Sequence, residues 1–256
     1  MATQAIAVNP ASVPWRLLTL ERGGSAQIQM YLPGTDGGAE AVRARIKDGY
    51  EVEPHFHLAA QFQLLLAGTM TFPTFTLAAP AVHYTEHNVP YGPFIVNGGH
   101  DMLVLHAKPG GVISMNDRER RRQANTRGRE LTCCAQEVEW EPLPGHAGAR
   151  HKVLIPARRG PSAEIVECPP QMELAVPMSP YGRYEVVYQG SVVVDGQELG
   201  PQGLRFVDAG QAAPPLAAGP QGATVILLSF DADAARGYGG NTEEVLARME
   251  QEHGKN

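Results

Sequence analysis

Apolar residues recur along the chain in short runs of Val, Leu, Phe, Thr and Tyr, five to seven residues long, broken by Gly, Pro or Asn. This spacing is typical of short β-strands joined by turns. The segments MTFPTFTL and SVVVDGQEL, which begin at Met70 and Ser191, each predict a β-hairpin. In the second of these, Asp195-Gly196 is a strong turn signal.

The C-terminal segment NTEEVLARMEQEH, after Gly240, has a different spacing. Asn241 or Thr242 is a suitable N-cap, and the apolar residues that follow share one helical face: Val245, Leu246 and Met249. The pattern therefore predicts a short helix at the end of the chain.

Two stretches of the sequence align without a gap over about thirty residues, at an offset of about 122 positions. The first begins at Phe62 and the second at Tyr184, and Gly68 of the first matches Gly190 of the second. The shared order of strand and turn predicts an all-β protein of two tandem domains. We expect an N-terminal domain at 1–116, a linker at 117–139, a C-terminal domain at 140–235 and a helical tail at 236–256.

Composition narrows the class of protein. The 256 residues include 28 Gly and 21 Pro, a frequency that suits many turns. The net charge of −6 argues against nucleic-acid binding, so the arginine-rich stretch at 118–129 is interpreted as an exposed linker or an inter-subunit contact. Three cysteines make a poor disulfide framework, and neither a secretory signal nor an apolar run of membrane-spanning length is present. We therefore expect a cytoplasmic protein that binds neither nucleic acid nor a membrane.

Histidines concentrate in the first copy of the repeat. Six of the nine fall within 52 residues of it: His55, His57, His83, His87, His100 and His106. Residues two apart on a strand face the same side, so His55 and His57 should point into one space, joined by Gln61 if the strand continues. Two neutral imidazoles and an oxygen donor form most of a shell for Fe(II), Mn, Ni or Zn.

The intervals around these residues resemble the first motif of the cupin superfamily. Gly49 is followed after five residues by His55, then by His57, Gln61 and finally Gly68 at the spacing of that motif. Gln61 stands where the family has a glutamate. With two copies, the chain resembles a bicupin, which implies two tandem double-stranded β-helix (jelly-roll) barrels and, commonly, a homodimer.

The second cupin motif is degenerate. In register with the repeat, Tyr91 occupies the position of the family's third histidine. Three arrangements remain open: Tyr91 ligates a metal, His83 or His87 supplies the missing nitrogen, or the pocket holds no metal and its histidines bind ligand directly. We take His55, His57, Gln61 and Tyr91 as candidate metal ligands.

Other polar residues of the first copy are assigned to the pocket. Tyr91 and His87 are the candidates for orienting substrate or moving a proton. The side chains of Gln63, His83 and His106 are expected to line the substrate pocket.

The second copy lacks this donor set. Its equivalents of the four candidate ligands are Pro177, Ser179, Arg183 and Ala213, and arginine offers no lone pair to a cation. We expect this domain to keep the fold without the site. Arg183 either pairs with Glu185 inside the domain or receives a carboxylate.

The resemblance makes a non-haem iron dioxygenase the leading functional hypothesis, acting on a small dicarbonyl, enol or aromatic acid in the N-terminal barrel. One alternative is a bicupin that binds or senses a small molecule without catalysis. A second is a metal-dependent isomerase, lyase or hydrolase that uses the same ligands without O2.

Overall fold

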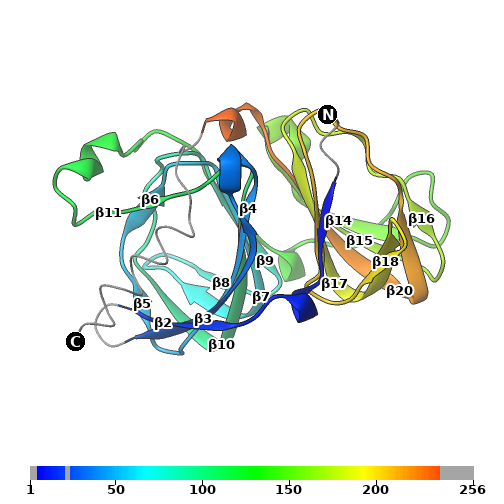
Figure 1. The fold of residues 1–256 in the computed structure, drawn as a ribbon, viewed down its shortest axis with the longest axis horizontal. Coiled ribbons are helices and arrows are strands. Elements are labelled where there is room, and N and C mark those ends of the chain that lie inside the picture. Colours follow the sequence, from blue (N-terminus) through cyan, green and yellow to red (C-terminus); the bar gives the residue numbers. More distant parts are fainter. Residues whose placement is uncertain (1–4, 21–23, 237–256) are drawn as a thin grey trace. The chain divides into compact units, whose positions relative to one another are not determined.

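The computed structural model describes residues 5–20 and 24–236. Within these residues the fold is all-β, with short 3-10 turns and no α-helix (Figure 1). The 3-10 turns are η1 (Pro10–Ser12), η3 (Thr35–Gly37), η4 (Arg120–Gln123), η5 (Ala135–Glu137), η6 (Ala157–Arg159) and η7 (Ala232–Ala235). No helix in this part of the chain has the length and apolar character needed to cross a bilayer. The expected C-terminal helix lies outside the described residues.

The chain divides into two compact units. Unit 2, which carries the histidine-rich segment, comprises residues 13–134 and the segment that begins at Asp233. Its main sheet has the strand order β12-β9-β7-β10-β4-β3-β2, with β5 on β10, β8 on β7, and a separate pair of β6 and β11. These strands are β2 (Arg16–Thr19), β3 (Ser25–Pro33), β4 (Glu40–Ile46), β5 (Glu51–Val52), β6 (His55–His57), β7 (Gln61–Thr71), β8 (Thr76–Ala78), β9 (Ala81–Thr85), β10 (Phe94–His106), β11 (Val112–Ser114) and β12 (Glu130–Cys134).

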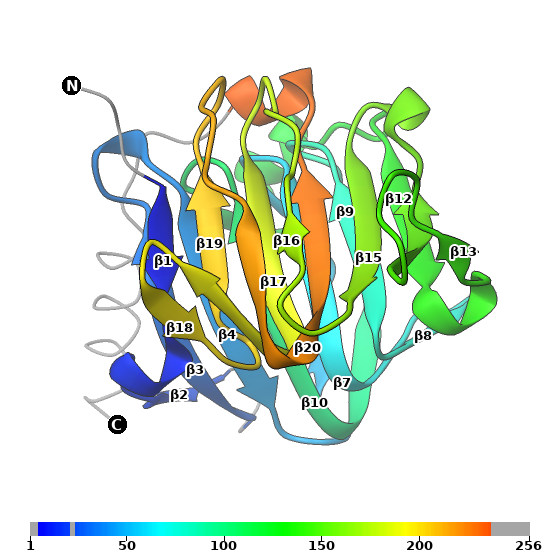
Figure 2. The ribbon, with the colours of Figure 1, turned by 90° about the vertical axis from the view of Figure 1, so that its right-hand side faces the viewer.

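Unit 1 comprises the N-terminal segment up to Ser12 and residues 135–232. Its sheet has the order β1-β19-β17-β20-β15-β14-β13, with β16 on β20 and β18 on β17; Figure 2 shows β19, β17, β20 and β15 side by side. These strands are β1 (Ile6–Val8), β13 (Glu141–Pro142), β14 (Arg150–Ile155), β15 (Ser162–Cys168), β16 (Glu173–Leu174), β17 (Arg183–Val194), β18 (Gln197–Leu199), β19 (Leu204–Val207) and β20 (Leu216–Ser229).

The same pairing pattern occurs in both units. β9-β7-β10-β4 in unit 2 corresponds to β19-β17-β20-β15 in unit 1, which supports the internal repeat. Both predicted hairpins form, as β7–β8 and β17–β18. Asp195 and Gly196 both have positive φ angles, 51° and 78°, as a two-residue hairpin turn of this type requires.

Gly68 and Gly190 occupy matching irregularities in the two units. Both have positive φ angles, and a Cβ on Gly68 would lie 2.4 Å from the carbonyl oxygen of Asn97. On Gly190 it would lie 2.1 Å from the carbonyl oxygen of Gly222. Each position therefore requires glycine, because the neighbouring strand approaches too closely for a side chain.

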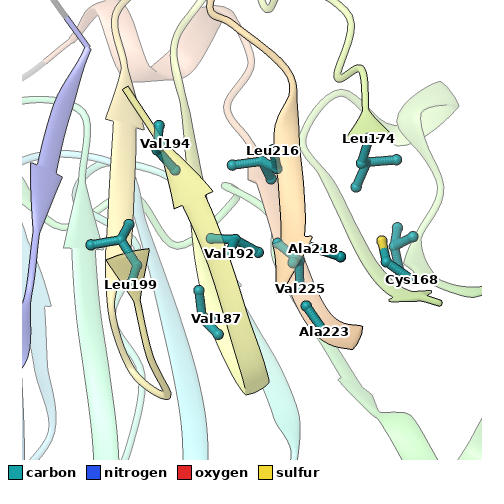
Figure 3. Close-up of a cluster of buried hydrophobic side chains, with 11 residues drawn as sticks. Cys168, Leu174, Val187, Val192, Val194, Leu199, Leu216, Ala218, Ala223 and Val225 are labelled. Carbon is teal, nitrogen blue, oxygen red and sulfur yellow. The ribbon is translucent and has the colours of Figure 1, made fainter. Parts of the chain in front are cut away.

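Each unit has its own apolar core. In unit 1, valines of β17 pack with leucines and alanines of β18 and β20 and with Cys168 (Figure 3). In unit 2, a comparable cluster contains Leu65, Met70, Phe94, Val96 and Met102. The Tyr91 ring belongs to this cluster, so the core of unit 2 directly supports one of the candidate site residues.

The boundaries of the units differ from those expected from the sequence. The segment 117–139 contains β12, whose residues Glu130–Cys134 pair with β9, so it does not serve as a linker throughout. The N-terminal strand β1 pairs with β19 and so belongs to unit 1. These assignments depend on pairing between distant strands, which local composition does not report.

Candidate functional site

The strand β6 presents His55 and His57 on one side, with Phe56 buried between them on the other. The two imidazole ring centroids lie 5.4 Å apart. The strand is held by β11, in which Ser114 pairs with His55 and Val112 with His57. The alternation of residues along a strand therefore places the two rings as the sequence pattern predicted.

Tyr91 faces His55 across an isolated β-bridge. The His55 Nε2 atom lies 2.7 Å from the Tyr91 hydroxyl, and the His55 Nδ1 atom lies 2.7 Å from the Glu53 carbonyl oxygen. Because a carbonyl oxygen only accepts, Nδ1 carries the proton and Nε2 accepts from the tyrosine hydroxyl.

A chain of hydrogen bonds continues from this hydroxyl. Gln63 Nε2 donates to the Tyr91 oxygen at 2.7 Å, and Gln63 Oε1 lies 2.7 Å from His83 Nδ1. His83 Nε2 is 2.9 Å from Glu130 Oε1, whose side chain is 35% exposed. Every bond in the chain is satisfied when both ring nitrogens of His83 donate. The chain thus links the histidine pair to a partly exposed carboxylate.

Burial governs the protonation of the candidate ligands. It lowers the pKa of His55 to about 4. It also lowers the pKa of His57 well below the ordinary value, with further contributions from the nearby His106 and His55 rings. Both imidazoles are therefore neutral at pH 7, the form in which histidine binds a metal. Burial raises the pKa of Tyr91, more than the amides of Gln61 and Gln63 lower it, so Tyr91 remains a phenol.

Gln61 is fully buried at the start of β7. Its amide nitrogen donates to the Thr85 hydroxyl at 3.0 Å, while its Oε1 atom has no hydrogen-bond partner in the described structure. The His57 Nδ1 atom is likewise buried and without a partner there. Two buried polar atoms left in this state are costly, and they indicate that something else satisfies them.

His106 lies opposite Gln61 on β10, and its ring centroid is 5.0 Å from that of His57. Its nitrogens, however, contact other groups: Nδ1 lies 3.2 Å from the Ala60 carbonyl oxygen and Nε2 lies 3.7 Å from Glu40 Oε1. Gly110 packs so closely that a Cβ there would lie 2.4 Å from Nε2. The structure therefore brings His106 to the cluster with Nδ1 near a backbone carbonyl oxygen and Nε2 turned toward the Glu40 carboxylate.

His87 is held by a residue far along the chain. The His87 backbone nitrogen donates to Asp233 Oδ2 at 2.7 Å, and the His87 Nδ1 atom lies 2.6 Å from Asp233 Oδ1. Among the described contacts none joins the His87 side chain to His55 or His57. The backbone next to it does approach, because Asn88 N donates to the His57 carbonyl oxygen at 2.7 Å.

The sequence did not predict Glu130, Thr85, Glu40 or Asp233 as residues of the site. Glu130 fell within the expected linker, and Asp233 is 146 residues from His87. For Thr85 a signal was available, since it shares the facing of His83 on β9 and β9 pairs with β7.

The donor chemistry of this cluster fits a divalent cation. It offers neutral imidazoles and an amide oxygen. Two buried atoms of these groups, His57 Nδ1 and Gln61 Oε1, have no hydrogen-bond partner in the described structure. Within residues 5–20 and 24–236 no group of three His, Cys, Asp or Glu side chains is close enough to hold a metal. Gln61 and Tyr91, which lie in the cluster, are not among these residue types.

The comparable positions of unit 1 carry different chemistry. Arg183 and Glu185 form a buried ion pair, with Nε and Oε1 2.7 Å apart, which confirms the internal pairing considered from the sequence. Ser179 donates to the Gly182 carbonyl oxygen within its own loop. Among its described residues, unit 1 therefore has no histidine pair matching that of unit 2.

The sequence matches no protein-family model and no curated protein. Solved structures do resemble the fold. A putative dioxygenase from Nostoc punctiforme superposes with a TM-score of 0.68 at 13% identity, over 91% of this chain and 85% of that one. Oxalate decarboxylases from Bacillus subtilis and Lactobacillus farciminis each superpose with a TM-score of 0.61 at 12% identity, over 90% of this chain. The superposition covers 77% of the Bacillus subtilis chain and 87% of the Lactobacillus farciminis chain. These are cupin-fold proteins, and at such identity the likeness establishes the all-β fold alone.

Proposed function

We propose that unit 2 is a metal-dependent cupin enzyme, an oxygenase that acts on a small dicarbonyl, enol or aromatic acid. The observation that carries the proposal is a pair of buried atoms that have no hydrogen-bond partner among the described residues, His57 Nδ1 and Gln61 Oε1. They lie beside imidazoles that burial keeps neutral. Similarity of fold to a putative dioxygenase and to oxalate decarboxylases is consistent with it.

In this proposal His55, His57 and Gln61 hold the metal, with Fe(II) the leading candidate. The ion, when bound, supplies a Lewis-acidic and redox-active position at which O2 and a chelating substrate meet. Tyr91 remains a neutral phenol whose hydroxyl donates to His55 Nε2 in this structure. If the lone pair of His55 Nε2 were taken by a metal, the Tyr91 hydroxyl would be released to donate to an oxygen of the substrate.

The remaining polar residues position this hydroxyl. Gln63 donates to the Tyr91 oxygen and His83 fixes the Gln63 amide, so the Tyr91 proton is directed away from Gln63. His83 and Glu130 hold a proton at the outer end of the chain, where the carboxylate reaches solvent. The apolar cluster around Tyr91 limits the access of water.

The second candidate function is metal-free binding of a small molecule. The hydrogen bond between His55 Nε2 and the Tyr91 hydroxyl favours it, because the lone pair that a metal would use is already engaged. In that case the histidine pair and Gln61 bind ligand directly.

Elemental analysis of untagged protein, followed by O2 uptake with 1,3-dicarbonyl and phenolic compounds, separates these functions. We expect iron near one equivalent, substrate-dependent O2 consumption, and loss of both in His57→Ala. The matched control His146→Ala, a histidine of unit 1, should retain both. Metal-free protein whose ligand binding survives a chelator would overturn the proposal in favour of the binding function. Metal-dependent turnover without O2 would instead indicate an isomerase, lyase or hydrolase.

A further inference from the structure

The interior of unit 1 contains a buried triad of charged side chains. Arg183 and Glu185 lie on β17, and Arg205 lies directly opposite Glu185 on β19. Arg183 Nε donates to Glu185 Oε1 at 2.7 Å, and Arg205 Nε donates to Glu185 Oε2 at 2.5 Å. All three side chains are 1% exposed. Two guanidinium groups against one carboxylate leave a buried charge of +1, since arginine does not lose its proton.

The triad also has unused hydrogen-bond donors. Arg183 Nη1 donates to the Pro177 carbonyl oxygen at 2.5 Å. Arg183 Nη2 and both terminal nitrogens of Arg205 are buried and have no acceptor in the described part of the chain. A buried charged donor without an acceptor is much more costly than a paired one. An anion would compensate the buried charge and supply an acceptor to the three guanidinium nitrogens that have none in the described part of the chain.

These three residues replace the centre of the polar chain in unit 2. At the offset of the internal repeat, Arg183 corresponds to Gln61, Glu185 to Gln63 and Arg205 to His83. The interior position that collects cation-ligating or neutral polar groups in unit 2 thus collects positive charge in unit 1. Val187, next on the same face of β17, belongs to the apolar core (Figure 3), which confirms that this face points inward.

We propose that unit 1 binds a small organic carboxylate between Arg183 and Arg205. A monoanion brings the charge of the triad to zero, and the two oxygens of a carboxylate match the planar donor fork of a guanidinium. The site lies close to the surface, because the Arg183 guanidinium reaches the carbonyl of Pro177, an exposed residue of the loop that precedes β17.

The probe for this site is sodium acetate, titrated calorimetrically into the full chain in a low-salt zwitterionic buffer, with thermal unfolding measured in parallel. We expect saturation at one acetate per chain and a rise in the unfolding midpoint. Glu185→Gln raises the charge of the pair of arginines to +2 and should tighten acetate binding by roughly tenfold or more. Arg205→Met removes two of the free nitrogens and the excess charge, and should abolish saturable binding.

Two controls make the result specific. Arg150→Met removes an exposed arginine of the same unit and should leave acetate binding unchanged. His57→Ala, which alters the candidate site of unit 2, should also leave it unchanged. Binding that disappears in His57→Ala, or that persists in Arg205→Met, would overturn the assignment. So would the absence of acetate dependence in both the natural protein and Glu185→Gln, or full displacement of acetate by an equal concentration of chloride. If Arg205→Met does not fold, the Glu185→Gln comparison decides.

Discussion

His55 and Tyr91 are joined twice, by reciprocal backbone hydrogen bonds of 3.2 and 3.0 Å and by a side-chain hydrogen bond of 2.7 Å. The backbone pairing fixes the spacing of the two residues, so the tyrosine hydroxyl meets the imidazole nitrogen without reorganisation. Tyr91 therefore lies beside the histidine pair as a hydrogen-bond donor to His55.

Removal of that hydroxyl should cost stability. Tyr91→Phe leaves His55 Nε2 and the Gln63 amide nitrogen without their shared partner, and we expect a loss of about 1–3 kcal/mol in the free energy of unfolding. Urea denaturation at pH 7 measures it. Tyr188→Phe in unit 1, where no hydroxyl hydrogen bond is described, is the matched control and should change stability by less than about 0.5 kcal/mol. Equal effects of the two variants would show that the Tyr91 hydroxyl contributes little.

Restoration of the missing carboxylate should strengthen metal binding. Gln61→Glu places a negative charge beside the two imidazoles, and the affinity for Fe(II) or Mn(II) should rise at least roughly tenfold. Anaerobic titration of the chelator-treated protein measures the dissociation constant. Gln189→Glu, an exposed glutamine of unit 1, controls for the change in net charge and should have no effect. An unchanged affinity in Gln61→Glu would mean that Gln61 does not contact the metal.

The buried pair of Arg43 and Asp101 should make unit 2 sensitive to acid. Arg43 bonds the Asp101 carboxylate at 2.8 and 2.6 Å, and Arg45 adds a third contact at 2.8 Å. Burial alone raises the pKa of Asp101, but the hydrogen bonds and charges of the two arginines outweigh it and hold the pKa below its ordinary value. At pH values above the ordinary aspartate pKa of 3.8, the pair contributes its full stabilisation to the fold. This stabilisation is lost as the pH falls through the lowered pKa that Asp101 has in the folded protein.

Asp101→Ala tests this directly. At pH 7 it should cost about 3–5 kcal/mol, because it leaves two arginines beside an empty position. The difference from the natural protein should shrink as denaturation is repeated at pH values below about 4. Glu198→Gln, an exposed carboxylate of unit 1, should show no such convergence. A difference that stays constant down to pH 2.5 would contradict the role of the Asp101 charge.

His100 should destabilise the protein as the pH falls from neutral. It is 1% exposed, neither ring nitrogen has a hydrogen-bond partner in the described structure, and burial lowers its pKa to about 4. The unfolded chain binds a proton near pH 6.5 and the folded chain does not, so this residue's contribution declines between pH 6.5 and 4. His100→Leu should be equally stable or more stable by up to about 3 kcal/mol at pH 7. Its advantage should grow at pH 5, as urea denaturation at the two pH values would show; a variant less stable at both would refute the prediction.

The sequence anticipates features that depend on short intervals. The parity of His55 and His57 on a strand and the two hairpins follow from residues a few positions apart. The all-β class and the internal repeat follow from the same kind of local pattern.

Contacts between residues distant in the sequence could not be predicted from such local patterns. Glu130 reaches His83 because β12 pairs with β9, and Asp233 reaches His87 across 146 residues of chain. Neither pairing has a local signature, because any carboxylate on a suitably placed edge serves as the partner. Arg205 was missed for the same reason: its relation to Glu185 depends on the register of β17 and β19.

Each unit includes a segment that is distant from it in the sequence: β1 completes the sheet of unit 1, and Asp233 accepts hydrogen bonds from His87 of unit 2. A fragment of the chain that contains the C-terminal half alone would therefore lack the edge strand β1 of its sheet. A fragment that contains the N-terminal half alone would lack Asp233, the hydrogen-bond acceptor of His87. The separate roles of the two units are therefore best studied with point variants in the full sequence rather than with isolated halves.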